Sequence, residues 1–290
     1  MTDAAIRVRE LRKTYDGRAV LDRMSFDVPR GSICGLVGPN GAGKTTTLRV
    51  LMGFASAETG STAVLGVDGP MTPALLQRVA FVPEAKDLYP FARAGEMIRL
   101  TRGFYAAWDH ALEAALVGEL EIPLRTWCTK LSKGTLARLW LLLALCRGAE
   151  LLILDEPTDG LDPVALDRVQ RLLVRQVADR GVTVLFSTHQ LGEVEQIADH
   201  LVMVHRGRCA VEGSLDDIRQ RYRVVRCLLD DERNDVPAAL EGWRRDGRFL
   251  TGVSSDDPTE MAERLVSSGV QVLDAQPASL KDVFLDHVAR

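Results

Sequence analysis

Residues 38–45 have the composition and spacing of a loop that binds phosphate groups. They fit the pattern GxxxxGK[ST], whose positions are filled here by Gly38, Pro39, Asn40, Gly41, Ala42, Gly43, Lys44 and Thr45. Glycines let backbone N–H groups turn toward phosphate oxygens, and the N-terminus of a following helix adds about half a positive charge. We expect Lys44 to neutralise the β- and γ-phosphates of a nucleotide and the Thr45 hydroxyl to bind Mg²⁺. Thr46 is expected to join the binding loop and to begin a helix over residues 46–52.

Two carboxylates follow an apolar strand pattern further along the chain. Residues 151–154 are all apolar, and Asp155 and Glu156 come directly after them. Ligands of parallel sheets collect at the C-terminal ends of the strands, so both acids are expected beside the phosphate loop. We expect Asp155 to reach Mg²⁺ directly or through water, and Glu156 to be the catalytic base for the attacking water. A core strand with a polar end would have the same sequence, and the phosphate loop favours the catalytic interpretation.

A histidine ends a second predicted strand. His189 comes just after the predicted strand of residues 182–187, and its ring is expected to donate a hydrogen bond to the γ-phosphate as charge builds there. A lone histidine is more often structural, but the strand-end position beside Asp155 and Glu156 favours function. The remaining histidines have no comparable context: His110, His200, His205 and His287.

Strand patterns alternate with helical ones, which favours a parallel α/β sheet. The predicted parallel strands cover residues 32–37, 79–82, 151–154, 182–187 and 201–204. Before them, residues 6–11 and 19–28 predict an antiparallel pair around a turn at Asp16 and Gly17. The expected fold class is α/β: a P-loop NTPase core of mainly parallel sheet with an antiparallel β edge, a helical subdomain and a small C-terminal α+β domain.

We divide the chain into a nucleotide-binding domain of residues 1–218 and an accessory domain of residues 219–290. The first is expected to contain a helical subdomain over about residues 87–147, with Asp109 as a helix cap. The acidic run at residues 230–235 is interpreted as a solvated turn, because its carboxylates lack the spacing of a calcium loop. In the accessory domain, strands are predicted at residues 224–229, 249–253 and 270–273 and a helix at residues 259–266.

Composition excludes several classes of function. The 290 residues carry 36 Lys and Arg against 40 Asp and Glu, so there is no basic excess to attract nucleic acid. The longest apolar run, residues 139–146, is far shorter than the roughly 20 residues of a bilayer span. The first residues lack the apolar core of a secretory signal, and the five cysteines form no CxxC pair. We therefore expect a cytoplasmic chain with reduced thiols.

In this order, the motifs resemble the ATP-binding subunit of ATP-binding cassette (ABC) transporters, over about residues 6–215. The decisive stretch is LSKGT at residues 131–135, which is similar to the family signature LSGGQ and departs from it at Lys133 and Thr135. The resemblance implies that Ser132 and Gly134 contact the γ-phosphate bound by the opposite subunit. Taken alone, the stretch could equally be a plain helix cap, and its place in the series of motifs favours the signature.

Three further positions take their expected roles from the resemblance alone. Tyr15 matches the aromatic residue that stacks on adenine, and Asp162 matches a loop that contacts the partner subunit. Glu84 stands where the family usually has Gln, a residue that senses Mg²⁺ and the attacking water. A glutamate keeps an oxygen ligand for the metal but adds negative charge.

The resemblance implies a function as well as a fold. It indicates an ATPase that uses ATP and Mg²⁺, pairs with an identical or similar ATPase subunit, and works with a separate transmembrane permease at the inner face of the cell membrane. The signature, Glu84 and residues 279–285 resemble bacterial exporters of drugs, antibiotics or lipids. Two alternatives stay open: a soluble ABC-type ATPase that acts on DNA or ribosomes, and a regulatory cassette that hydrolyses ATP poorly. The first is disfavoured because there is one motif set and no heptad insert.

Overall fold

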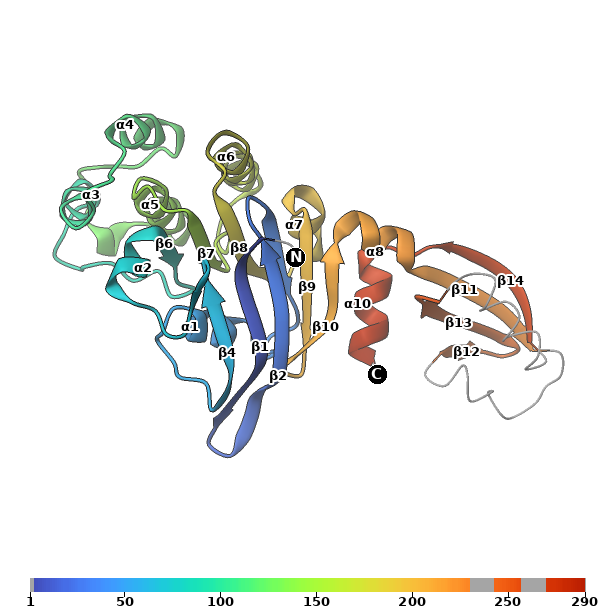
Figure 1. The fold of residues 1–290 in the computed structure, drawn as a ribbon. Coiled ribbons are helices and arrows are strands. Elements are labelled where there is room, and N and C mark those ends of the chain that lie inside the picture. The colour runs from blue at the N-terminus through green and yellow to red at the C-terminus, as the bar shows by residue number, and fades with distance from the viewer. Residues whose placement is uncertain (1–2, 230–242, 257–269, 290) are drawn as a thin grey trace. The chain divides into compact units, whose positions relative to one another are not determined.

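The computed structural model describes residues 3–229, 243–256 and 270–289. The chain forms two compact units, an N-terminal unit (Met1–Glu212) and a C-terminal unit (Gly213–Arg290), and Figure 1 draws both. The sequence placed this division after residue 218, a few residues later. Among the described residues no helix is long and apolar enough to cross a membrane, and all five cysteines are free thiols.

A six-stranded sheet of the order β10-β9-β3-β8-β7-β6 forms the centre of the N-terminal unit (Figure 1). Its strands are β3 (Ile33–Val37), β6 (Val79–Val82), β7 (Leu151–Asp155), β8 (Thr183–Thr188), β9 (His200–His205) and β10 (Arg208–Ser214). The pairs β9-β3, β3-β8, β8-β7 and β7-β6 are all parallel, and every residue of β3, β7 and β8 is buried. Full burial is typical of parallel strands covered on both faces. The predicted α/β fold is confirmed, with each parallel strand within one residue of its expected bounds.

An antiparallel sheet of the order β2-β1-β4-β5 lies in the same unit. Its strands are β1 (Ala4–Tyr15), β2 (Arg18–Pro29), β4 (Thr59–Val64) and β5 (Val67–Asp68). The predicted turn joins β1 to β2: Asp16 and Gly17 have φ angles of 48° and 77°, as a tight hairpin turn requires. The sequence anticipated this hairpin but not β4 and β5.

The described residues of the N-terminal unit (3–212) also form eight helical segments. They are α1 (Lys44–Leu51), α2 (Pro73–Arg78), α3 (Ala94–Arg102), α4 (His110–Glu119), the 3-10 turn η1 (Cys128–Lys130), α5 (Lys133–Leu145), α6 (Pro163–Arg180) and α7 (Leu191–Ile197). Helices α3, α4 and α5 fall within the stretch expected to be helical. Asp109 caps α4 by accepting a hydrogen bond of 2.8 Å from the Leu112 N–H, as predicted.

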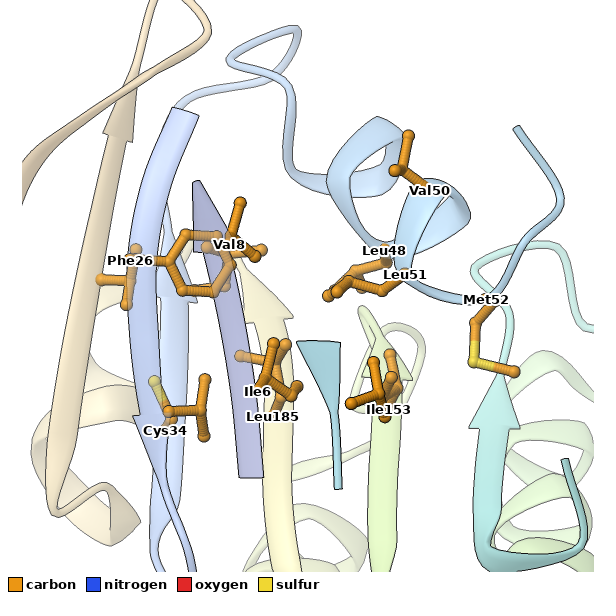
Figure 2. Packing of buried hydrophobic residues seen from close by; sticks show 14 of the residues in the cluster. Ile6, Val8, Phe26, Cys34, Leu48, Val50, Leu51, Met52, Ile153 and Leu185 are labelled. Carbon is orange, nitrogen blue, oxygen red and sulfur yellow. The ribbon is translucent and has the colours of Figure 1, made fainter. Parts of the chain in front are cut away.

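The main apolar core of this unit fixes α1 to both sheets. Leu48 and Leu51 extend from α1 toward the strands that carry Ile153 and Leu185 (Figure 2), and Phe26 of β2 packs in the same cluster. These side chains are at most 2% exposed, and burial of each contributes about 1.5–3 kcal/mol. Because α1 begins at Lys44, the same core holds the end of the phosphate loop in place.

The C-terminal unit contains an antiparallel sheet of the order β12-β13-β11-β14. Its elements are α8 (Leu215–Arg221), β11 (Arg223–Leu229), β12 (Arg244–Asp246), β13 (Phe249–Ser254), β14 (Val270–Pro277) and α10 (Leu280–Ala289). Three of these strands were predicted, and β14 extends four residues beyond its expected end at residue 273. The predicted helix at residues 259–266 and the acidic run at residues 230–235 lie outside the described residues.

Candidate active site

The phosphate loop connects the end of β3 to the start of α1. Gly43 is the N-cap residue of α1 with a φ angle of 109°, a left-handed conformation that favours glycine. A Cβ atom at Gly38 would lie 2.3 Å from the Val204 carbonyl oxygen, which leaves no room for a side chain. The loop can therefore follow this path only with glycine at both positions.

The ammonium group of Lys44 lies between the phosphate loop and the end of β7. Its Nζ donates a hydrogen bond of 2.7 Å to the Gly38 carbonyl oxygen and lies 3.6 Å from Glu156 Oε1. The Lys44 side chain is only 6% exposed, and a buried charge needs such partners. A positive charge is thus fixed at the point where the loop turns.

Asp155 lies directly beside the hydroxyl of Thr45. The Thr45 Oγ1 donates to Asp155 Oδ1 at 3.2 Å, and the Ser187 hydroxyl donates to the same oxygen at 2.6 Å. Asp155 and Ser187 are directly paired across β7 and β8, which explains the second contact. Hydroxyl and carboxylate oxygens are the ligands that Mg²⁺ prefers.

No group of three or more His, Cys, Asp or Glu side chains in the described part of the chain could hold a metal ion on its own. Mg²⁺ is commonly held by one or two protein oxygens together with substrate phosphates. The pair formed by Thr45 and Asp155 fits that mode of binding.

The backbone of Glu156 has an unusual conformation that hydrogen bonds hold from both sides. Its φ angle is 44°, which costs a residue with a side chain about 1–2 kcal/mol. The Glu156 N–H donates to Ser187 Oγ at 3.0 Å, and Lys86 Nζ donates to the Glu156 carbonyl oxygen at 2.8 Å. These bonds hold the residue in place at the end of β7.

The Glu156 carboxylate is largely buried and faces the Lys44 ammonium group and the His189 ring. Burial raises the pKa of Glu156, while Lys44 and His189 act in the opposite direction. His189 Nδ1 lies 3.1 Å from Glu156 Oε2, and the ring is about half exposed. Because Nδ1 faces the carboxylate, Nε2 is the ring nitrogen available to another group. Lys44, Glu156 and His189 are thus brought together as the sequence predicted.

A cavity of about 200 Å³ opens over the phosphate loop. Its lining consists of Val20, Asn40, Gly41, Ala42, Gly43, Lys44, Thr45, Thr46, Glu84 and Glu156. A neighbouring cavity of about 460 Å³ is lined by both Glu84 and Asp155. Glu84 thus lines both cavities, one beside the phosphate loop and one beside Asp155, and its role at Mg²⁺ stays a prediction.

The signature residues lie elsewhere on the N-terminal unit. Ser132 caps α5 by accepting a hydrogen bond from the Thr135 N–H at 3.2 Å, and the side chains of Ser132 and Lys133 are exposed. A Cβ atom at Gly134 would lie 2.8 Å from the Gly160 carbonyl oxygen. The signature thus packs against the loop that leads to Asp162, and none of these residues lines the cavity over the phosphate loop.

Asp162 has a structural role that the sequence analysis did not anticipate. Its carboxylate caps α6 by accepting hydrogen bonds of 3.0 Å from the Val164 N–H and 2.9 Å from the Ala165 N–H. The sequence signal was present, since Pro163 stands at the first helical position after an Asp. Tyr15 ends β1 with 43% exposure and lies outside the cavity lining, so adenine stacking stays a prediction.

Other residues around the site were not singled out from the sequence. Ser187 and Lys86 support Asp155 and Glu156 as described above. In addition, the buried Glu193 accepts hydrogen bonds of 2.7 Å from both Thr158 and Thr188. This carboxylate ties the segment after β7 to the end of β8, so it holds the two strand ends in register.

Comparison with known proteins places these motifs in a family. A family model described as ABC transporter matches residues 21–159, and one described as AAA domain, putative AbiEii toxin, Type IV TA system matches residues 128–195. The chain is 32% identical to Nod factor export ATP-binding protein I of Rhizobium etli, over 97% of this chain and 92% of the relative. It is 33% identical to the bacitracin transport ATP-binding protein BcrA of Bacillus licheniformis, over 80% of this chain and 77% of that protein.

Solved structures agree with this similarity. One described as an ATP binding subunit of ABC transporter has 30% identity and a TM-score of 0.66, covering 74% of this chain and 92% of that one. The dimeric cassette MJ0796 superposes with the same TM-score at 20% identity, covering 72% of this chain and 98% of that one, a likeness of fold.

Proposed function

Because this chain belongs to the ABC transporter family as an ATP-binding subunit, we propose that ATP hydrolysis at its phosphate loop powers export through a separate transmembrane permease. The observation that carries the proposal is the similarity to export and transport ATP-binding proteins over most of both chains. We also propose that LSKGT at residues 131–135 acts as the signature segment of this subunit.

The cavity over residues 38–45 receives the phosphates of ATP. Backbone N–H groups of the loop and the start of α1 face the phosphate oxygens, and Lys44 supplies the fixed positive charge. Thr45, Asp155 and Glu84 hold Mg²⁺ through oxygen atoms. When bound, this ion neutralises charge on the β- and γ-phosphates.

Hydrolysis is assigned to Glu156 and His189. The Glu156 carboxylate accepts the proton of the attacking water. Burial raises the pKa of Glu156, and Lys44 and His189 act against that effect. The Nε2 side of His189 faces the γ-phosphate as negative charge develops there. The contact between His189 and Glu156 holds both groups in the required orientation.

A second ATPase subunit, identical or similar, completes each site. Ser132 and Gly134 at the start of α5 contact the γ-phosphate bound by the partner, where the helix N-terminus favours negative charge. Asp162 lies on the surface that meets the partner, and Tyr15 stacks on adenine. This arrangement explains why Ser132 and Lys133 are exposed in the single chain.

The permease meets the region that follows Glu84. Large apolar side chains are exposed there, namely Tyr89 (63%), Phe91 (80%) and Phe104 (68%). Exposed aromatic residues of this kind are typical of surfaces that bind another protein. Contact with the permease places the chain at the inner face of the cell membrane, and no nucleic acid takes part.

Two experiments test the proposal. In the first, the full chain is purified from membranes of its source. In the second, ATP-dependent uptake of the exported substrate is measured in inverted membrane vesicles that contain the chain. We expect a multi-span protein to co-purify, and export to need ATP and to be lost in the Glu156→Gln variant. Recovery of the chain with ribosomes or DNA at physiological salt, without a multi-span partner, would overturn the proposal.

A further inference from the structure

The signature segment contains a series of hydrogen bonds behind the exposed Ser132 hydroxyl. Thr135 Oγ1 lies 2.9 Å from Ser132 Oγ, and the Thr135 N–H donates to the same Ser132 oxygen at 3.2 Å. Arg138 Nη2 donates to Thr135 Oγ1 at 3.3 Å. Because Thr135 and Arg138 are half-buried and Ser132 is exposed, the series runs outward and ends at the surface.

A guanidinium group only donates, so Thr135 Oγ1 accepts from Arg138 whichever of the two hydroxyls donates to the other. If Ser132 donated to Thr135, the Thr135 hydroxyl proton would have no acceptor among the residues that the structure describes. If Thr135 donates to Ser132, the proton without an acceptor is instead that of Ser132. This arrangement is favoured because Ser132 is exposed, where an outside group can accept the proton, whereas Thr135 is half-buried. Ser132 Oγ then accepts from the N–H and the O–H of Thr135, which uses both of its lone pairs. The proton of Ser132 is left to be donated outward.

Arg138 is itself held firmly in position. Its Nη1 donates to the Leu120 carbonyl oxygen at 2.8 Å and lies 3.4 Å from Glu121 Oε2. Glu121 in turn pairs with Arg168 of α6 at 2.7 Å. The Arg138 side chain is only 18% exposed, so its charge polarises the adjacent hydroxyls more strongly than a solvated charge would.

We propose that Thr135 and Arg138 are positioning residues that hold the Ser132 hydroxyl as a hydrogen-bond donor to the γ-phosphate bound by a second copy of this chain. The inference rests on the two-subunit site proposed above. A hydroxyl whose proton already points outward binds an anionic oxygen without first breaking a local hydrogen bond. Thr135 thereby gives the variant signature a function of its own.

The experiment uses the Glu156→Gln chain as parent, because it is expected to accumulate an ATP-bound dimer. Thr135→Val keeps the shape of the side chain and removes the hydroxyl, and Thr135→Ser is the matched control that retains it. Sedimentation velocity gives the ATP concentration at which half of the protein is dimeric. We expect Thr135→Val to raise this concentration about fivefold, the scale of one hydrogen bond, and Thr135→Ser to stay within about twofold of the parent.

A double-variant cycle separates positioning from a general effect on the helix. Ser132→Ala alone is expected to raise the half-dimer concentration about tenfold, and addition of Thr135→Val to it is expected to change nothing further. ATP binding to the dilute monomer, which reports correct folding of the phosphate loop, is expected to be the same in all variants. An equal loss from Thr135→Val with and without Ser132 would overturn the inference.

The outcomes also distinguish the inference from the function on which it rests. A parent chain that forms no dimer with ATP overturns the two-subunit site and the positioning role together. A parent that dimerises normally, with Thr135→Val indistinguishable from it, overturns the positioning role alone.

Discussion

The two groups of site residues on the N-terminal unit lie in contrasting surroundings. The side chains of Lys44 and Glu156 are 6% and 12% exposed and contact groups from several elements far apart in the sequence. Ser132 and Lys133 are exposed, and the hydrogen bonds of the Ser132 hydroxyl run to Thr135, three residues away. The residues around the phosphate loop are held by contacts within the N-terminal unit, whereas in the proposed dimer the signature residues contact the partner subunit. We therefore expect the single chain to bind ATP, and hydrolysis to depend on association.

Glu156→Gln is expected to have the largest effect among variants of the residues around the phosphate loop. We expect hydrolysis to fall about 10²–10⁴-fold because an amide cannot accept the proton of the attacking water, while ATP binding persists. Phosphate release and nucleotide titration measure the two effects. The control is Glu150→Gln, whose carboxylate pairs with Arg78 before the start of β7 and should leave hydrolysis unchanged. Unimpaired hydrolysis in Glu156→Gln would refute the assignment of the base.

Lys44→Ala tests whether the phosphate loop binds ATP in the single chain, without a partner subunit. We expect ATP affinity to fall about ten- to hundredfold, the scale of lost hydrogen bonds to a charged group. Equilibrium titration of the dilute monomer measures this loss. Lys281→Ala removes an exposed lysine of the C-terminal unit and serves as the control. Unchanged affinity in Lys44→Ala would mean that the loop binds phosphate through its backbone alone.

Lys86→Met tests the support behind Glu156. Loss of the 2.8 Å hydrogen bond to the Glu156 carbonyl oxygen is expected to lower kcat about five- to tenfold and to leave KM unchanged. Steady-state kinetics separate the two constants, and Lys86→Arg should restore part of kcat. A change in KM alone would assign Lys86 to substrate binding instead.

Asp162→Ala is expected to have the smallest effect on the protein. It changes the loop against which the signature segment packs. Removal of the N-cap is expected to lower the melting temperature by a few degrees, whereas Asp162→Asn retains an acceptor and most of the stability. Backbone N–H groups of α6 lower the pKa of Asp162. The advantage of Asp over Asn is therefore complete above the ordinary carboxyl pKa of about 3.9 and is lost as the pH falls through the lowered value.

Thermal scans at several pH values measure this advantage. If Asp162→Asn keeps its stability at neutral pH but hydrolyses ATP more slowly, the charge of Asp162 acts on the partner as well. If both properties are unchanged, the residue is a cap only.

The phosphate loop was predictable because all of its information is contiguous. A strand pattern, the glycine-rich residues 38–45 and a helical pattern follow one another, and the structure places β3 and α1 accordingly. The cap at Asp109 was predictable for the same reason, since it acts on an N–H three residues away. Local patterns of this kind need no knowledge of how the chain folds back on itself.

The support around the loop could not be predicted, because it depends on contacts between distant segments. Ser187 contacts Asp155 only through the register of β8 on β7, and Lys86 reaches Glu156 only through the path of the chain after β6. Strand β4 was missed because its buried residues, Ala63 and Val64, stand only at its end, and pairing with β1 determines its conformation. Sequence patterns singled out the candidate catalytic groups but not the residues that hold them in place.

The presence of a phosphate loop and a signature on one chain makes genetic complementation possible. A dimer of a Lys44→Ala chain with a Ser132→Ala chain would combine both lesions in one of its two composite sites. The other site would join an intact loop to an intact signature. We therefore expect a mixture of the two impaired variants to hydrolyse ATP faster than either variant alone, with up to one intact site in each mixed dimer. No activity would return in the mixture if each chain completed its own site.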